Sequence, residues 1–379
     1  MISTDKRAQF DIPESVAYFN APQIGPLPKC AVEAGAQSYR DKSQPWANET
    51  QHTFFDQPER LRALGAALFE TAPDNIALVP AASYGLAVAA RNIALEPGDE
   101  ILVLEGQFPS NVYTWQALAD RTGARLRRLQ RAPEQSWAAC LIAAMGSKTA
   151  LVACAHVHWI DGGQIDLEAV AEAARNNGAA LVLDLTQSLG MMDIDLKTVD
   201  PDFAVAAAYK WLLSPYTSGF LYVAPRNQNG EPLEENWISR SGSEDFSRLI
   251  DYQDTYQDGA RRFDMGERSS FQIVPGAIAA LEFFLGAGKT DIRSHARAIN
   301  ADIAERLGAL GFRDETPQRA AHYLSLTAPE QAPDDLAMRL RALDVHVSQR
   351  GPRLRIGAHI YNTTKDVDLL VDAVKGQLL

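Results

Sequence analysis

Short apolar runs alternate with amphipathic stretches along most of this chain. Five runs have the length and composition of buried strands, at residues 76–79, 100–104, 150–154, 180–183 and 203–207. Each ends in polar or small residues, and the first three lead into segments with helical spacing or helix-start residues. This strand–turn–helix repetition predicts an α/β fold, with a mostly parallel sheet covered by helices on both faces.

Helices are expected before and between these strands, and the pattern changes beyond them. The expected helices cover 29–40 and 57–70, then end near 92, 120 and 177, and a further strand covers 219–223. Residues 43–50 are predicted to form a loop. Residues 225–262 are polar and irregular, which predicts an excursion outside the core. The tail is expected to contain a helix at 290–309, a strand at 322–326, a helix at 333–343, strands near Val345 and Leu354, and a helix from Lys365.

This distribution predicts three parts. An N-terminal arm covers 1–28, a large domain 29–270, and a smaller α+β domain 271–379. A long helix at 270–285 is expected to connect the two domains. A chain of 379 residues is long enough for one large and one small core.

Composition excludes several function classes. The chain is 46% apolar and 22% charged, with a net charge of −12, which argues against a nucleic-acid partner. The first 15 residues contain no apolar core of a signal peptide, and no apolar run approaches the roughly 20 residues that span a bilayer. We therefore expect no membrane partner. Three cysteines without metal-ligand spacing suit reduced thiols in a cytoplasm.

The candidate chemistry lies at the ends of two neighbouring strands. Asp184 ends one apolar run, and Lys210 follows the next. Open parallel sheets place their working groups beyond the carboxyl ends of strands, so both side chains are expected to face one pocket. The chemistry that uses this pair is that of pyridoxal 5′-phosphate (PLP), in which a lysine forms a Schiff base and an acid keeps the pyridinium protonated. The alternative is a surface lysine and a helix-capping aspartate.

Other strand ends offer groups that suit a phosphorylated aromatic cofactor. Ala82 and Ser83 begin a predicted helix whose free N–H groups would cradle a phosphate, unless Ser83 only caps that helix. Phe108 could stack on a ring or pack in the core. Tyr209 could donate to a phosphate or merely pack. Arg355 alternates within a short strand and could grip a carboxylate, although Arg353 fits a surface role at least as well.

Histidines are also spaced at two residues, at His156 and His158, where we expect one strand face. A metal site would need a third ligand, which the sequence does not offer nearby. We therefore interpret them as a structural or substrate-side pair.

In their order and spacing these segments resemble the class V aminotransferases, PLP enzymes of fold type I. The group includes cysteine desulfurases, kynureninases and isopenicillin N epimerase-like proteins. The resemblance covers nearly the whole chain. Its most specific pieces are Asp184-Leu185-Thr186-Gln187-Ser188, Tyr209-Lys210-Trp211-Leu212, and Arg355 ahead of Tyr361-Asn362-Thr363.

The resemblance implies a role for each matching residue. Lys210 is the Schiff-base lysine, Asp184 the pyridinium partner, and Gln187 the donor to the phenolic oxygen of the ring. The remaining matches are Phe108 for stacking, Ala82, Ser83 and Tyr209 for the phosphate, and Arg355 for the substrate α-carboxylate. Family members are homodimers with the active site at the subunit interface, where the partner's Phe-Glu-x-Gly-Thr segment reaches the phosphate. Here that segment reads Phe263-Asp264-Met265-Gly266-Glu267, so we expect Ser269 or Ser270 to replace the threonine.

One departure concerns sulfur chemistry. Cysteine desulfurases carry a nucleophilic cysteine shortly before the arginine strand, and residues 346–352 contain none. We therefore expect a PLP enzyme that acts on a small α-amino acid through Lys210, with transamination first. A C–S or β-lyase, an epimerase and a non-catalytic PLP-fold binding protein stay open as alternatives. A nucleotide-binding protein would need a Gly-rich phosphate loop, which is absent from this sequence.

Overall fold

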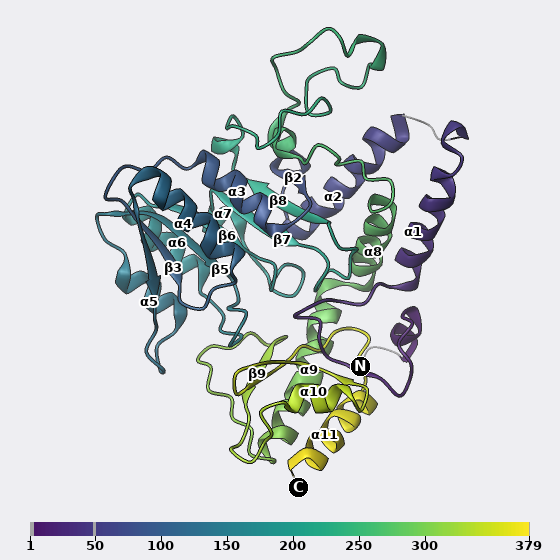
Figure 1. The fold of residues 1–379 in the computed structure, drawn as a ribbon, viewed down its shortest axis with the longest axis vertical. Helices are drawn as coiled ribbons and strands as arrows, with labels where there is room; N and C mark the ends of the chain where they lie inside the picture. The colour runs from purple at the N-terminus through teal and green to yellow at the C-terminus, as the bar shows by residue number, and fades with distance from the viewer. Residues whose placement is uncertain (1–3, 48–50, 379) are drawn as a thin grey trace.

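A seven-stranded sheet forms the centre of the molecule, which is a computed structural model describing residues 4–47 and 51–378 (Figure 1). Its order is β2-β8-β7-β6-β5-β3-β4. The strands are β2 (Ile76–Val79), β3 (Glu100–Leu104), β4 (Arg125–Leu129), β5 (Thr149–Ala155), β6 (Ala180–Asp184), β7 (Phe203–Ala207) and β8 (Gly219–Val223). The neighbours from β7 to β4 are parallel, and only β8 runs antiparallel to β7 and β2. The predicted mostly parallel sheet is confirmed.

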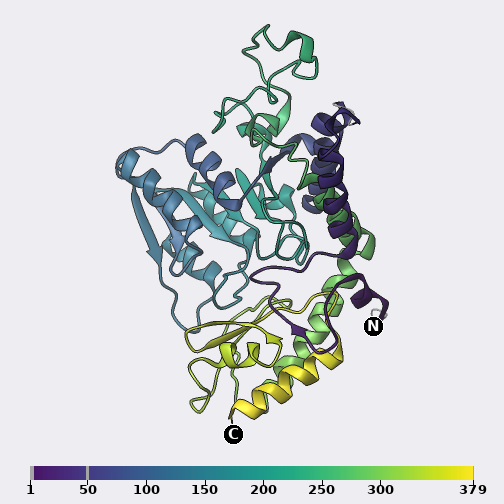
Figure 2. The same ribbon diagram turned by 45° about the vertical axis from the view of Figure 1, so that its right-hand side comes forward.

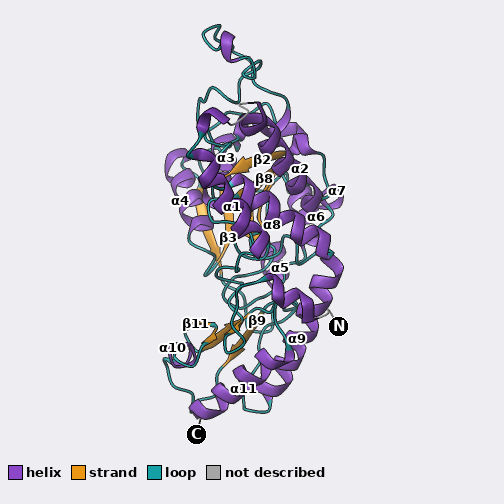
Figure 3. Cartoon of the chain, turned by 90° about the vertical axis from the view of Figure 1, so that its right-hand side faces the viewer, coloured by secondary structure: helices purple, strands orange, loops and turns teal. Residues whose placement is uncertain are grey.

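Helices cover both faces of this sheet, as the apolar strands require (Figure 3). The helices of this part are α1 (Lys29–Lys42), α2 (Gln57–Phe69), α3 (Ala82–Asn92), α4 (Ser110–Thr122), α5 (Trp137–Ala144), α6 (Leu167–Asn176), α7 (Leu196–Val199) and α8 (Val274–Ala287). Successive strand residues point to opposite faces and enter different cores: Leu102 belongs to the core that includes residues of α5, α6 and α8, whereas Val103 belongs to the core that includes residues of α3 and α4. Two apolar layers therefore hold the sheet.

Two elements of the sheet region were missed by the sequence pattern. Strand β4 reads Arg-Leu-Arg-Arg-Leu and buries only Leu129, because it lies at the edge of the sheet. Charged residues are typical of such edges, and they hide the strand from a search for apolar runs. Helix α5 is short, and it begins where the Ser136 hydroxyl accepts a hydrogen bond from the Ala139 N–H.

A second, smaller core lies below the large sheet in Figure 1. It contains the antiparallel sheet β11-β12-β9 and three helices. These elements are β9 (Leu324–Thr327), β11 (Ser348–Arg350), β12 (Arg353–Ile356), α9 (Lys289–Gly308), α10 (Leu336–Arg341) and α11 (Thr364–Leu378). This separate core supports our proposal of a small C-terminal domain. The predicted connector helix corresponds to α8, which continues into α9 after Gly288.

The N-terminal arm ties the two parts together. Its strand β1 (Ala17–Tyr18) pairs in parallel with β10 (Val345–His346) of the small part. After this pair the chain runs between the small part and the large sheet before α1 begins (Figure 2). The predicted loop at 43–50 contains a 3-10 turn at Pro45–Ala47, and its last three residues lie outside the described part of the chain.

The predicted excursion at 225–262 projects from the opposite end of the molecule to the small part (Figure 1). Its regular structure is limited to the short 3-10 helices Pro225–Asn227, Phe246–Arg248 and Gly259–Phe263. Within residues 4–47 and 51–378, no helix combines the length and apolar character needed to cross a bilayer.

Candidate active site

A cavity of about 350 Å³ opens at one edge of the large sheet. Its walls come from the residues that follow β2, β3, β5, β6 and β7, and from the turn before β8. This is the edge where the parallel strands have their carboxyl ends, so polar side chains converge there without disturbing the apolar sheet.

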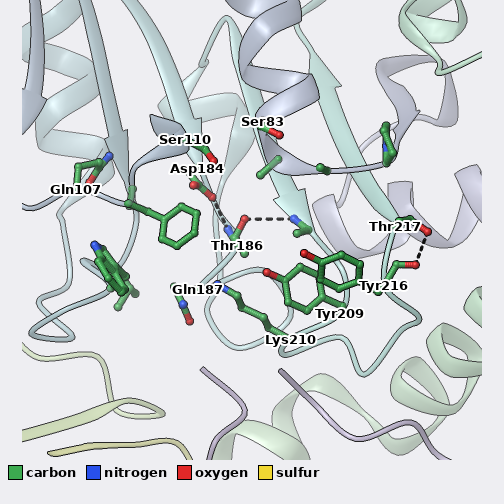
Figure 4. A pocket seen from close by; sticks show the side chains of 18 residues that line it. Ser83, Gln107, Ser110, Asp184, Thr186, Gln187, Tyr209, Lys210, Tyr216 and Thr217 are labelled. Atoms are coloured by element: carbon green, nitrogen blue, oxygen red, sulfur yellow. Dashed lines mark hydrogen bonds between the residues drawn. The ribbon is translucent and has the colours of Figure 1, made fainter. Parts of the chain in front are cut away.

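Asp184 and Lys210 both line this cavity (Figure 4). Asp184 is the last residue of β6, and Lys210 lies three residues beyond the end of β7. The Asp184 Oδ1 accepts a hydrogen bond from the Thr186 N–H (2.9 Å), and the Thr186 Oγ1 accepts one from the Ala207 N–H (3.2 Å). Thr186 therefore links the ends of the two strands and holds the carboxylate on the cavity side.

Burial changes the chemistry of the Lys210 amine. The side chain is only 7% exposed, and this desolvation lowers its pKa to about 8, with a further lowering from Arg355 that Asp184 opposes. The Nζ atom lies 5.4 Å from the centroid of the Phe108 ring and 5.7 Å from that of Tyr209. The amine is therefore substantially neutral at pH 8, where an ordinary lysine is almost wholly protonated.

This lowered pKa predicts a pH dependence that can be measured on the cofactor-free protein. Only the neutral amine attacks an aldehyde, so the rate of Lys210 modification should rise with pH and reach half its maximum at about pH 8. Trapping with borohydride and peptide mass mapping would follow Lys210 and other lysines in one experiment. A half-point at the ordinary lysine value near 10.4 would contradict the prediction.

One end of the cavity lies at the start of α3. The residue before this helix is Ala81, whose side chain cannot cap it, and Ala82 and Ser83 form its first two positions. The first N–H groups of a helix have no partner within it, so these two are available to a ligand. The alternative that Ser83 is the N-cap is wrong. Figure 4 shows Ser83 across the cavity from Lys210.

Next to this end the cavity presents an aromatic face and an unpaired amide. Phe108 remains 40% exposed and meets Trp159 edge-on, with ring centroids 5.4 Å apart. Gln107 is 5% exposed, and neither polar atom of its side chain has a hydrogen-bond partner among the described residues. Leaving a buried amide unpaired costs free energy, which indicates that a polar ligand completes it.

Gln187 and Tyr209 line the same cavity. The Gln187 Oε1 accepts a hydrogen bond from the Trp211 Nε1 (2.8 Å), and its Nε2 donates to the Pro22 carbonyl oxygen (3.0 Å). One amide hydrogen remains for a ligand, because the nitrogen carries two. The Tyr209 ring packs against Tyr216 at 4.6 Å, and burial raises the pKa of the Tyr209 hydroxyl, so it would act as a neutral donor.

Arg355 lies behind Trp159 and does not itself form the cavity wall. It is 2% exposed, its Nε donates to the Tyr323 hydroxyl at 2.6 Å, and its Cζ is 5.2 Å from the Trp159 ring centroid. Within residues 4–47 and 51–378 no carboxylate pairs with it, whereas Arg353 lies 3.6 Å from Glu315. A buried guanidinium without an acid is costly, which favours Arg355 over Arg353 as a candidate for binding an anionic ligand.

Ser269, His156 and His158 also lie outside the cavity wall of this chain. The Ser269 hydroxyl donates to the Phe54 carbonyl oxygen (2.8 Å). Ser269 could therefore contact a cofactor phosphate only in the site of a partner subunit. His156 and His158 follow β5 and do not act as a pair. His158 faces Asp161 (3.2 Å), whereas His156 borders a different depression, and burial lowers its pKa to about 4. Among the described residues no group of three ligands could hold a metal ion.

The cavity-lining residues that the sequence pattern did not single out include Gln107, Thr186 and Tyr216. A signal existed for two of them, because Gln107 precedes Phe108 and Thr186 lies within the Asp184 turn. Tyr216 lies in the turn before β8 and is 63% exposed. Only the packing of that turn against Tyr209 reveals its position.

The N-terminal arm forms the floor beneath Lys210. The Gly25 N–H donates to the Tyr209 carbonyl oxygen (2.9 Å), and a Cβ atom at Gly25 would lie 2.1 Å from the Lys210 carbonyl oxygen. No side chain fits at this distance, so glycine allows the arm to approach the lysine backbone.

Replacing Gly25 by alanine should therefore displace the Lys210 backbone and destabilise the protein by about 1–3 kcal/mol. Thermal unfolding of the cofactor-free protein measures this loss. Gly35→Ala is the matched control, because a Cβ there meets nothing within 4 Å and helix propensity should raise stability by about 0.5–1 kcal/mol. Equal melting temperatures for Gly25→Ala and the wild type would contradict the close approach.

A family model and curated relatives both match this chain over most of its length. The family model described as Aminotransferase class-V matches residues 18–370. An isopenicillin N epimerase from Streptomyces clavuligerus is 27% identical and covers 98% of this chain and 97% of its own. The aminotransferase YcbU from Bacillus subtilis is 26% identical and covers 92% of this chain and 91% of its own.

Solved structures agree on the fold. The cystine C–S lyase C-DES superimposes with a TM-score of 0.86 at 21% identity, covering 95% of this chain and 97% of its own. A cysteine desulfurase from Thermococcus onnurineus NA1 gives a TM-score of 0.83 at 20% identity, and 99% of each chain is covered. At such identities the likeness establishes the architecture alone.

Proposed function

The chain belongs to the class V aminotransferase family of PLP-dependent enzymes, and from that premise we propose that it acts on the amino group of a small α-amino acid, with transamination as its reaction. The observation that carries the proposal is the cavity in which a buried lysine of lowered pKa and a strand-end aspartate lie together. Structural roles alone would not require either charge there.

The cavity residues fit PLP. Lys210 would attach it covalently, Asp184 would hold a proton at its ring nitrogen, and the N–H groups of Ala82 and Ser83 would bind its phosphate. Phe108 would pack on its ring, while Gln187, Tyr209 and the unpaired amide of Gln107 would hydrogen-bond its polar edge. When bound, PLP withdraws electrons from the substrate α-carbon.

The chain's own residues would then perform the steps around that carbon. Arg355 would bind the substrate α-carboxylate through a charge-assisted fork. The Lys210 amine, once released, would take the α-proton as general base and return it at another carbon for transamination. Apolar walls and the ring of Trp159 would keep water from the developing charge.

Two related reactions remain alternatives. Relatives and neighbours include an epimerase and a C–S lyase, which would differ from a transaminase in where Lys210 returns the proton or which bond breaks. Persulfide formation on the protein is disfavoured, because Cys140 and Cys154 are buried and Cys30 lies on the outside of α1. No described cysteine lines the cavity.

We also infer a homodimer in which the partner's 263–270 segment completes the phosphate site, with Ser269 in place of the usual threonine. The exposed Ile250 and Tyr252 of the projecting segment support an interface there. The three unpaired cysteines support a cytoplasmic location. Light scattering would test the dimer, and Ser269→Ala should weaken PLP binding while leaving the oligomeric state unchanged.

The proposed function is tested with the purified holoenzyme. A yellow absorption band that borohydride reduction fixes to Lys210 would establish the cofactor link. A panel of amino acids with and without keto-acid acceptors, assayed for keto acid, ammonia and racemisation, then separates transamination, elimination and epimerisation. If no amino acid perturbs the band, the non-catalytic alternative is favoured and the proposal fails.

A further inference from the structure

The small sheet carries three arginines on one face, and two of them lie against Trp159 of the cavity wall. Arg353 and Arg355 lie two residues apart on β12 and share a face, and Arg350 on β11 is the direct cross-strand neighbour of Arg353. Ser325, which pairs with Arg355, donates its hydroxyl to the Ile160 carbonyl oxygen at 2.9 Å. This face therefore points toward the loop that carries Trp159.

Among the described residues, only Arg353 of these three arginines has an acidic partner. Glu315 lies 3.6 Å from Arg353 and accepts from the Thr327 hydroxyl at 2.7 Å. Neither Arg350 nor Arg355 forms an ion pair within residues 4–47 and 51–378. The Arg350 Nη1 has only the neighbouring Gln349 carbonyl oxygen, at 2.7 Å. Arg350 also lies opposite Arg353 in the sheet, where like charges destabilise the pairing, and the buried Arg355 guanidinium has no acid to offset its desolvation, so a structural role alone does not explain these two unneutralised groups.

Both unneutralised guanidinium groups meet the same ring. The Cζ atoms of Arg350 and Arg355 lie 5.3 and 5.2 Å from the centroid of Trp159, which forms part of the cavity wall. Arg355 is buried, and Arg350 is exposed. Partial desolvation and the charge of Arg355 both lower the pKa of Arg350, although it stays protonated near neutral pH. Two positive charges, the buried Arg355 and the exposed Arg350, therefore lie on the side of the cavity that Trp159 forms.

We infer that Arg350 is a specificity-determining residue that binds a second carboxylate on the substrate side chain, so that the enzyme selects amino dicarboxylates. The inference rests on the proposed function, in which Arg355 takes the α-carboxylate. A diacid would neutralise both guanidinium groups, whereas a monocarboxylate would leave Arg350 unpaired. Residues 346–352, which carry Arg350 at the end of β11, contain no cysteine.

The test measures binding without turnover. Isothermal titration of the holoenzyme with succinate, glutarate and adipate, against butyrate, compares two carboxylates with one and scans their separation. We expect the best diacid to bind at least tenfold more tightly than butyrate. Arg350→Gln should weaken that diacid about tenfold and leave butyrate unchanged, and Arg350→Lys should retain part of the preference. Arg341→Gln on the exposed end of α10 is the matched control.

Spectral titration with L-aspartate and L-glutamate, against L-asparagine and L-glutamine, repeats the comparison on amino acids. Equal affinity for diacids and butyrate in the wild type, or an unchanged ratio in Arg350→Gln, would overturn the inference even if amino acids still perturb the absorption band. A band that responds to no amino acid would count against the proposed function instead. In that case the diacid-to-butyrate ratio still decides whether Arg350 is an anion site.

Discussion

Replacing Lys210 by alanine is expected to abolish covalent attachment of the cofactor and to lower kcat/KM by at least about 10²–10⁴-fold. This is the range that positioned general acid–base catalysis supplies, and Lys210 would also lose its role as the attachment point. The effect should be chemical and not structural, because the Lys210 side chain donates no hydrogen bond and forms no ion pair within the described residues and lies near the rings of Phe108 and Tyr209.

Amine rescue makes this prediction specific. Small primary amines such as methylamine should restore part of the Lys210→Ala activity, because they can reach the vacated cavity space and accept the α-proton. Lys197→Ala, at an exposed position on α7, is the control and should behave as the wild type. Lys210→Ala activity within tenfold of the wild type, or rescue by sodium chloride as well as by methylamine, would place the proton transfer on another residue.

Replacing Arg62 by methionine is expected to reduce the free energy of unfolding by about 3–5 kcal/mol. Arg62 on α2 is fully buried, and its Nη1 and Nη2 donate to Asp264 at 3.0 and 2.6 Å. Asp264, 1% exposed, also accepts from the Arg268 Nη1 (2.6 Å) and from the Leu78 N–H (2.7 Å). Removing Arg62 leaves the buried Asp264 carboxylate with Arg268 as its remaining ion-pair partner among the described residues.

This loss should extend to the 263–270 segment, because Asp264 fixes that segment against β2. Urea unfolding of the cofactor-free protein measures the stability change without a contribution from bound ligand. Arg226→Met is the matched control: that arginine is 44% exposed and pairs with Asp200 and Asp202, so we expect a loss below about 1 kcal/mol. If Arg62→Met and Arg226→Met lost similar free energies of unfolding, burial would not be what sets the contribution of the Arg62–Asp264 pair to stability.

The site residues that the sequence could identify are those that directly follow an apolar run, because such a run predicts where a strand ends. An apolar run that ends in Asp184, and another that leads into Lys210, predict two strand ends at one edge of a sheet, and both side chains do line one cavity. The Arg-rich edge strand β4 escaped the same reasoning, because an edge strand does not need apolar residues on both faces. The cofactor roles of the individual residues remain predictions.

Sequence by itself determined the order of the apolar strands and of most helices, and it identified the family, because hydrophobic periodicity and short ordered motifs are local properties of the chain. Only the tertiary structure decided which arginines lack an acid, that the arm at Gly25 runs beneath Lys210, and that the Gln107 amide is buried without a partner. Charge pairing and desolvation depend on groups that are distant in sequence and become neighbours only when the chain is packed.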